Sequence, residues 1–143
     1  MKIKKDVRYY NTAKYFFTNH FAIRKDFCQY VGLESVGNWE VGRYLGTKLV
    51  GSVDGEDLEV EKYFLQERMG YVRARLTTEA RIHPSSHKVS TIIIKAEDGT
   101  SVGIDPGYTD LLSIGDIMIK GPKDPILVVA DGAVRSLIMP IRL

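Results

Sequence analysis

Few residues in this chain have side chains that could do chemistry. The sequence contains three histidines, His20, His83 and His87, and a single cysteine, Cys28. Zinc prefers such ligands, but only His83 and His87 lie close together along the chain, so no metal site and no cofactor is predicted. The pair could transfer protons together with an aspartate, which leaves a small hydrolase as one hypothesis. Because Pro84 predicts a turn, a solvated turn explains the pair more simply, and no catalytic residue is predicted.

Residues 24–47 resemble a helix-turn-helix. Cys28 stands at the small-residue position of the first helix and Gly32 at the glycine of the turn. Leu33 follows that glycine, and Val41 fills a core position of the second helix. The resemblance implies a regulator that binds nucleic acid.

This hypothesis assigns roles to polar residues around the motif. Positively charged side chains contact phosphates, and the second helix faces the bases. The residues concerned are Arg24, Lys25, Asn38, Arg43 and Lys48. Residues 1–53 carry nine basic and four acidic residues, which agrees with a nucleic-acid partner, although the whole chain has a formal charge of only +2.

Aromatic residues are concentrated near the beginning of the sequence. Ten of the fourteen lie between residues 9 and 44, more than one short helix can bury. Large amphipathic side chains of this kind dominate the binding energy of protein contact surfaces. The apolar residues near position 143 suggest a second contact. The predicted interface with protein partners consists of Tyr9, Tyr10, Tyr15, Phe16, Trp39, Tyr44, Ile141 and Leu143.

Two helices are expected to position the aromatic residues. Apolar residues recur at three- and four-residue steps over residues 13–30, which predicts a helix with a break near residues 19–20. A second helix is predicted over residues 58–69, where Gly70 ends it. Residues 1–70 are therefore expected to be mainly helical.

The pattern changes at residue 71. Apolar Val72, Ala74 and Leu76 alternate with polar residues, and residues 89–96 are rich in β-branched side chains. Turn pairs such as Asp98-Gly99 then divide residues 71–143 into five or six short strands. The expected fold class is α+β, with an N-terminal helical part followed by a small antiparallel β-barrel or sandwich. The two parts could also form one compact domain.

Residues 114–121 resemble a turn and strand of many small barrels. The sequence from Gly115 to Gly121 is similar to the pattern G-D-x-[VI]-x-[VI]-x-G but is one residue shorter, and it places Ile117 and Ile119 on one strand face. Similar segments occur in KOW-type barrels and in short phage-encoded proteins. The resemblance implies a barrel and suggests a phage particle as the setting.

Composition narrows the class of protein further. One cysteine excludes an intrachain disulfide and favours a reducing compartment. No signal peptide is recognised, and the longest apolar runs are far shorter than the roughly 20 residues that cross a bilayer. We therefore expect a cytoplasmic or virion protein with no membrane partner. The favoured function is non-enzymatic: a small assembly subunit, as a homo-oligomer or in a larger complex such as a phage virion.

Overall fold

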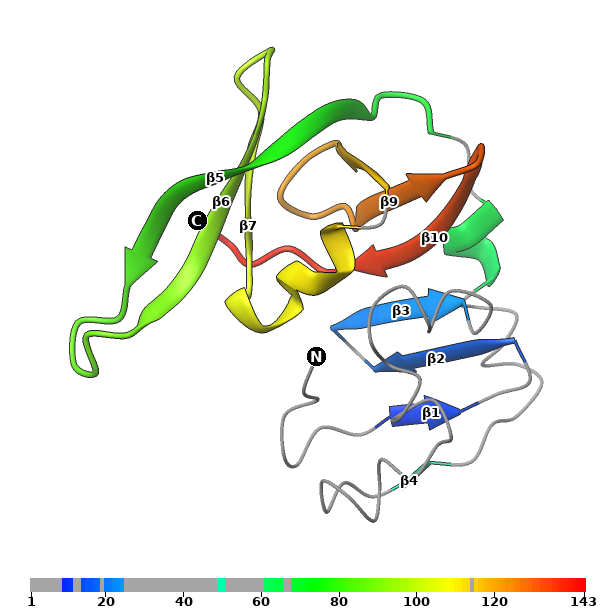
Figure 1. Cartoon of the computed structure of the whole chain (residues 1–143), viewed down its shortest axis with the longest axis horizontal. Helices are drawn as coiled ribbons and strands as arrows, with labels where there is room; N and C mark the ends of the chain where they lie inside the picture. Colours follow the sequence, from blue (N-terminus) through cyan, green and yellow to red (C-terminus); the bar gives the residue numbers. More distant parts are fainter. Residues whose placement is uncertain are drawn as a thin grey trace.

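The described residues form one open, mostly antiparallel sheet (Figure 1). Figure 1 is a computed structural model. It describes residues 9–11, 14–18, 20–24, 49–50, 61–65, 68–113 and 115–143. The strand order is β4-β1-β2-β3-β10-β9-β8-β5-β6-β7. The end strands β4 and β7 do not pair with each other, so the sheet is open and is not the closed barrel that was one of the two predicted forms.

The expectation of a mainly helical N-terminal part is not supported. Among the described residues of 1–70, only residues 61–65 are helical, and they lie within the helix predicted over residues 58–69. The chain instead forms β1 (Tyr9–Asn11), β2 (Tyr15–Thr18) and β3 (Phe21–Arg24), paired antiparallel. On its other side, β1 pairs in parallel with β4 (Leu49–Val50). Aromatic side chains pack well on a half-buried pleated surface, so a run rich in Tyr and Phe can favour strands as readily as a helix.

The break expected near residues 19–20 is the turn between β2 and β3. The hydroxyl oxygen of Thr18 accepts hydrogen bonds from the backbone N–H of His20 at 3.0 Å and of Phe21 at 3.3 Å. These bonds give the backbone N–H groups of the turn a hydrogen-bond partner on a nearby side chain. The sequence therefore signalled the position of the interruption correctly, but the elements on either side are strands.

The prediction of short strands after residue 71 is confirmed. Short turns join most of them, and the positive φ angles of Gly99 (94°) and Gly132 (76°) are ones that glycine adopts without strain. A 3₁₀ helix, η2 (Pro106–Leu112), connects β7 to β8. The strands are β5 (Val72–Ile82), β6 (Val89–Ala96), β7 (Ser101–Ile104), β8 (Asp116–Ile119), β9 (Ile126–Ala130) and β10 (Ala133–Ile138).

Two apolar clusters cover the two faces of the central strands. Successive residues of a strand point to opposite faces, so Leu127 joins one cluster and its neighbour Val128 joins the other. The helix η2 contributes Leu111 to the larger cluster, and Phe64 of the helical segment 61–65 contributes to the smaller one. None of the helices in the described ranges is long and apolar enough to cross a membrane.

The residues after β10 run beside two distant strands. The N–H of Met139 donates to the carbonyl oxygen of His20 at 2.8 Å, and the N–H of Ile141 donates to that of Gly103 at 2.8 Å. The contact with Gly103 on β7 is an isolated bridge and not a ladder. It brings this segment to the edge of the sheet without closing it.

The phenol of Tyr108 is buried in the larger cluster. Its ring packs on Phe21 with 5.1 Å between ring centroids, and its hydroxyl has no hydrogen-bond partner among the described residues. Burial, assisted by the negative charge of Asp105, raises the pKa of Tyr108 above its usual value. The folded state therefore keeps this proton to a higher pH than the unfolded chain does.

We expect Tyr108→Phe to leave stability unchanged or slightly higher at neutral pH, because it removes an unpaired buried hydroxyl. Above the unfolded pKa of about 10, the unfolded state binds fewer protons, so the wild-type free energy of unfolding falls as pH rises. Between about pH 8 and about pH 10.5, the free energy of unfolding measured with urea should fall less for the variant than for the wild type. Equal losses in both proteins would contradict this account of Tyr108.

Candidate functional site

A two-stranded hairpin extends beyond the rest of the sheet (Figure 1). Strand β8 pairs with β5 only along residues 72–74, and β7 pairs with β6 only along residues 92–95. Beyond these ladders, β5 and β6 pair only with each other. We call residues 75–91 the arm. Every residue from Thr78 to Val89 is exposed, so the outer arm adds no buried core.

A bulge divides the arm. Leu76 pairs with Ile94 and Ala80 pairs with Ile92, so three residues of β5 stand opposite Ile93 alone. The hydroxyl of Thr77 donates to the carbonyl oxygen of Ile93 at 2.8 Å and thereby replaces a ladder bond. Bulges bend a strand and increase its twist, which accounts for the change in direction of β5 along the arm.

The tip of the arm is a turn organised around His83. Its backbone N–H donates to the carbonyl oxygen of Lys88 at 2.8 Å, and its Nδ1 accepts from the backbone N–H of Ser85 at 3.2 Å. The hydroxyl oxygen of Ser85 lies 2.9 Å from the same nitrogen. His87 completes the turn with a positive φ of 56°. Nδ1 of His83 therefore stabilises the turn by accepting hydrogen bonds. This is a structural role for one of the two histidines considered for proton transfer.

Positive charge dominates the arm. Arg73 at its base donates to the Asp116 carboxylate at 2.7 Å, and Lys95 pairs with Glu79. Three further cations, Arg75, Arg81 and Lys88, form no ion pair with any residue of the described ranges. The sequence from residue 80 to residue 96 contains no acidic residue.

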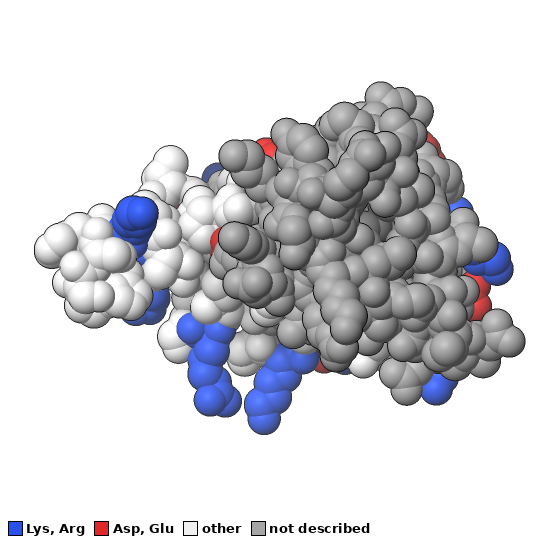
Figure 2. Space-filling model, turned by 90° about the horizontal axis from the view of Figure 1, so that it is seen from below, with Lys and Arg blue, Asp and Glu red and all other residues white. Residues whose placement is uncertain are grey.

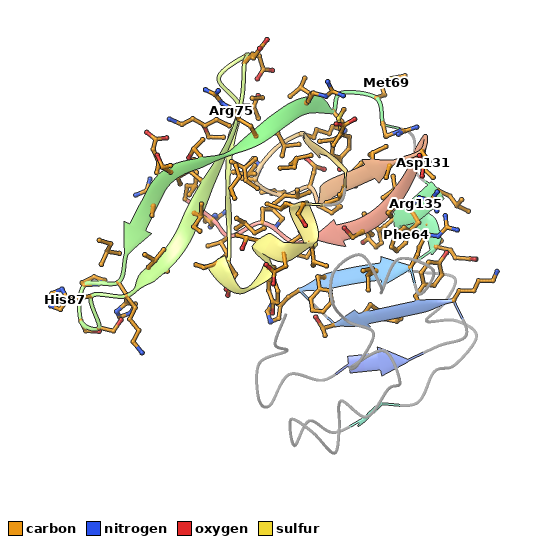
Figure 3. The ribbon with its side chains drawn as sticks, in the orientation of Figure 1. Phe64, Met69, Arg75, His87, Asp131 and Arg135 are labelled. Atoms are coloured by element: carbon orange, nitrogen blue, oxygen red, sulfur yellow. The ribbon has the colours of Figure 1, made fainter. Side chains whose placement is uncertain are left out.

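The pictures show how far this charge lies from the body of the protein. Figure 2 shows the hairpin end standing clear of the remaining atoms, with blue basic side chains and no red acidic atoms on the face in view. In Figure 3, His87 marks the far end of the arm and Arg75 lies along β5. The arm thus presents its cations on an extended projection.

A shallow concavity of about 380 Å³ lies on one face of the arm. Its walls combine apolar side chains with an ion pair and a further cation. The lining residues are Glu79, Ala80, Arg81, Ile93, Lys95, Ser101 and Leu143. The surface is open and carries more positive than negative groups.

A second surface is apolar. Phe64 is 7% exposed and stacks on Tyr15 with ring centroids 4.9 Å apart. In a helical segment, anchoring one residue turns its two neighbours away from the core, and Tyr63 and Leu65 are accordingly 51% and 79% exposed. Met69 is 78% exposed. Figure 3 places Met69 apart from Phe64, so we call only Tyr63 and Leu65 the apolar surface. Figure 3 shows Phe64 and Met69 at the opposite end of the molecule from His87.

The structure locates part of the predicted protein interface. Tyr15 is buried against Phe64, so packing within the chain accounts for it. Ile141 is half-buried beside β7, and Leu143 is 44% exposed at the concavity. Tyr9 and Tyr10 lie on β1 and Phe16 lies on β2, but their side chains are not described. Trp39 and Tyr44 lie outside the described residues.

The predicted nucleic-acid residues are mostly not described. Arg24 is the last residue of β3, where it pairs with Tyr15. The remaining residues of that prediction, Lys25, Asn38, Arg43 and Lys48, lie outside the described residues, as does Cys28.

Sequence reasoning missed the arm. Its cations and the exposed pair Ile82 and Val89 received no role, although the stretch without acidic residues is visible in the sequence. In the described part of the chain, no group of three or more His, Cys, Asp or Glu side chains could hold a metal ion. Comparison of the whole sequence with protein-family models and curated proteins, and of the structure with solved structures, gives no significant match.

Proposed function

We propose that this chain is a non-enzymatic assembly subunit that associates with further copies of itself through the apolar surface. The observation that carries the proposal is the exposure of Tyr63 and Leu65, at 51% and 79%, on either side of the anchored side chain of Phe64. Tyrosine is enriched at protein interfaces, and a central apolar residue is a common anchor. The partner would cover side chains that water now surrounds.

The charge of the chain supports a second copy as the partner. Its formal net charge is +2 over 143 residues, so two copies repel each other only weakly. The resemblance of residues 114–121 to a barrel segment of phage-encoded proteins makes a phage particle the setting we propose. In such a particle each subunit contacts its neighbours through one surface and leaves the arm available for another component.

We expect light scattering to give a mass that is a multiple of the 16.1 kDa chain and that persists as salt is raised, because apolar contacts are not screened. The double variant Tyr63→Ser, Leu65→Ser should shift the mass toward that of a single chain. Both side chains are exposed, so its unfolding midpoint should remain close to that of the wild type.

The matched control is Ile82→Ser, Val89→Ser, which removes two apolar side chains from the arm and should leave the oligomer intact. A wild-type protein with the mass of one chain at every concentration would overturn the proposal. An oligomer that only the arm variant dissociates would also reject the apolar surface as the contact.

A further inference from the structure

The unpaired cations of the arm lie on a ribbon of two strands. Arg81 and Lys88 are exposed near the tip and Arg75 is exposed nearer the body. None of the three forms an ion pair with a described residue, and the nearest acidic side chain on the arm, Glu79, is already paired with Lys95. A partner that brings negative charge would therefore meet three uncompensated cations.

The tip combines these cations with groups that suit nucleic acid. Ser86 is exposed and its hydroxyl oxygen only accepts within the turn, so its proton is available for a phosphate, a contact that hydroxyl groups share with Arg and Lys. Ile82 and Val89 face each other across the strands and are 61% and 48% exposed. Apolar side chains and proline at such positions contact sugars and base steps in architectural proteins, and the major groove admits a two-stranded ribbon.

A second copy of this chain does not suit the arm. The concavity that could receive the tip of another copy contains Arg81 and Lys95 against one carboxylate, Glu79. Two surfaces of the same sign would then face each other, since the tip itself carries Arg81 and Lys88 and no acidic residue. The charge favours a polyanion over self-association at this site.

We infer that the arm binds nucleic acid, with Arg75, Arg81 and Lys88 contacting the phosphate backbone. Such contacts position a protein on the duplex and carry no base preference of their own. These residues are not part of the apolar surface. Loss of nucleic-acid binding and loss of self-association can therefore be tested separately. The inference also differs from the helix-turn-helix hypothesis, because all of its residues lie on the arm.

The test is the anisotropy of a fluorescent duplex DNA titrated with the full chain. Three phosphate contacts predict that the logarithm of the affinity falls with the logarithm of salt with a slope of about −2.7, which is a loss of about 40-fold between about 50 and 200 mM salt. Arg81→Gln alone should reduce that slope by about one. The triple variant Arg75→Gln, Arg81→Gln, Lys88→Gln should remove most of the binding, while Lys123→Gln, at an exposed turn elsewhere, should bind as the wild type does.

Two results would overturn the inference. One is the absence of binding at about 50 mM salt, or binding that the triple variant retains in full. The other is displacement of the duplex by poly-glutamate at equal charge concentration, which would identify the arm as a site for acidic protein surfaces. Circular dichroism of each variant should match the wild type, because all three cations are exposed.

Discussion

Ile94→Ala should destabilise the fold by about 2–4 kcal/mol, whereas Ile82→Ala should cost about 1 kcal/mol or less. The two isoleucines lie on the two strands of the same hairpin. Ile94 is fully buried in the larger cluster, and Ile82 is 61% exposed at the outer end of the arm. Removing a buried side chain loses its transfer free energy and leaves a cavity, while water already surrounds the exposed one.

Chemical denaturation at neutral pH measures both variants against the wild type. The comparison holds the residue type and the substitution constant, so the difference reports burial alone. Similar losses of about 2 kcal/mol or more at both positions would show that the tip of the arm packs on the body, contrary to the structure.

Gly103→Ala should also destabilise the protein, by about 1–3 kcal/mol. A methyl group at this position would lie 2.5 Å from Cγ2 of Thr91 and 2.9 Å from the carbonyl oxygen of Ile141. Thr91 is buried and β-branched, and the Ile141 oxygen belongs to the backbone, so neither can move away easily. The substitution would force β7 away from β6 or from the segment after β10.

Gly121→Ala is the matched control for this substitution. A methyl group there would meet only the carboxylate oxygen of Asp124 at 3.4 Å, an ordinary contact, so we expect a change within about 0.5 kcal/mol. Urea unfolding of the two variants and the wild type measures these changes in the free energy of unfolding. A Gly103→Ala protein as stable as Gly121→Ala would mean that residues 139–143 do not lie against β7.

The fold after residue 71 was predictable because its signals are local. Turn pairs such as Asp98-Gly99 and Asp131-Gly132 mark the ends of strands, and the side chains between them alternate. The N-terminal strands lack such signals. Tyr15 and Phe17 are two residues apart, yet other aromatic residues nearby fit helical spacing, and the deciding contacts come from distant partners. β3 pairs with β10, and Phe64 covers Tyr15.

The arm was only partly predictable for a similar reason. The alternation of Val72, Ala74 and Leu76 predicted a strand, and the absence of acidic residues from 80 to 96 could have drawn attention to its charge. The projection itself follows from how far β7 and β8 extend along β5 and β6, which no local pattern reveals. Likewise, the exposure of Tyr63 and Leu65 depends on where Phe64 packs.

Hydrogen–deuterium exchange of the full chain, alone and with duplex DNA at low salt, tests the central claim about the arm most directly. Residues 80–90 lie beyond the neighbouring strands, so their amides should exchange faster than those of residues 92–96 in the protein alone. Added DNA should slow exchange in the arm and leave residues 63–69 unchanged. Slow exchange in the arm without DNA, or protection by DNA confined to other parts of the chain, would contradict the account.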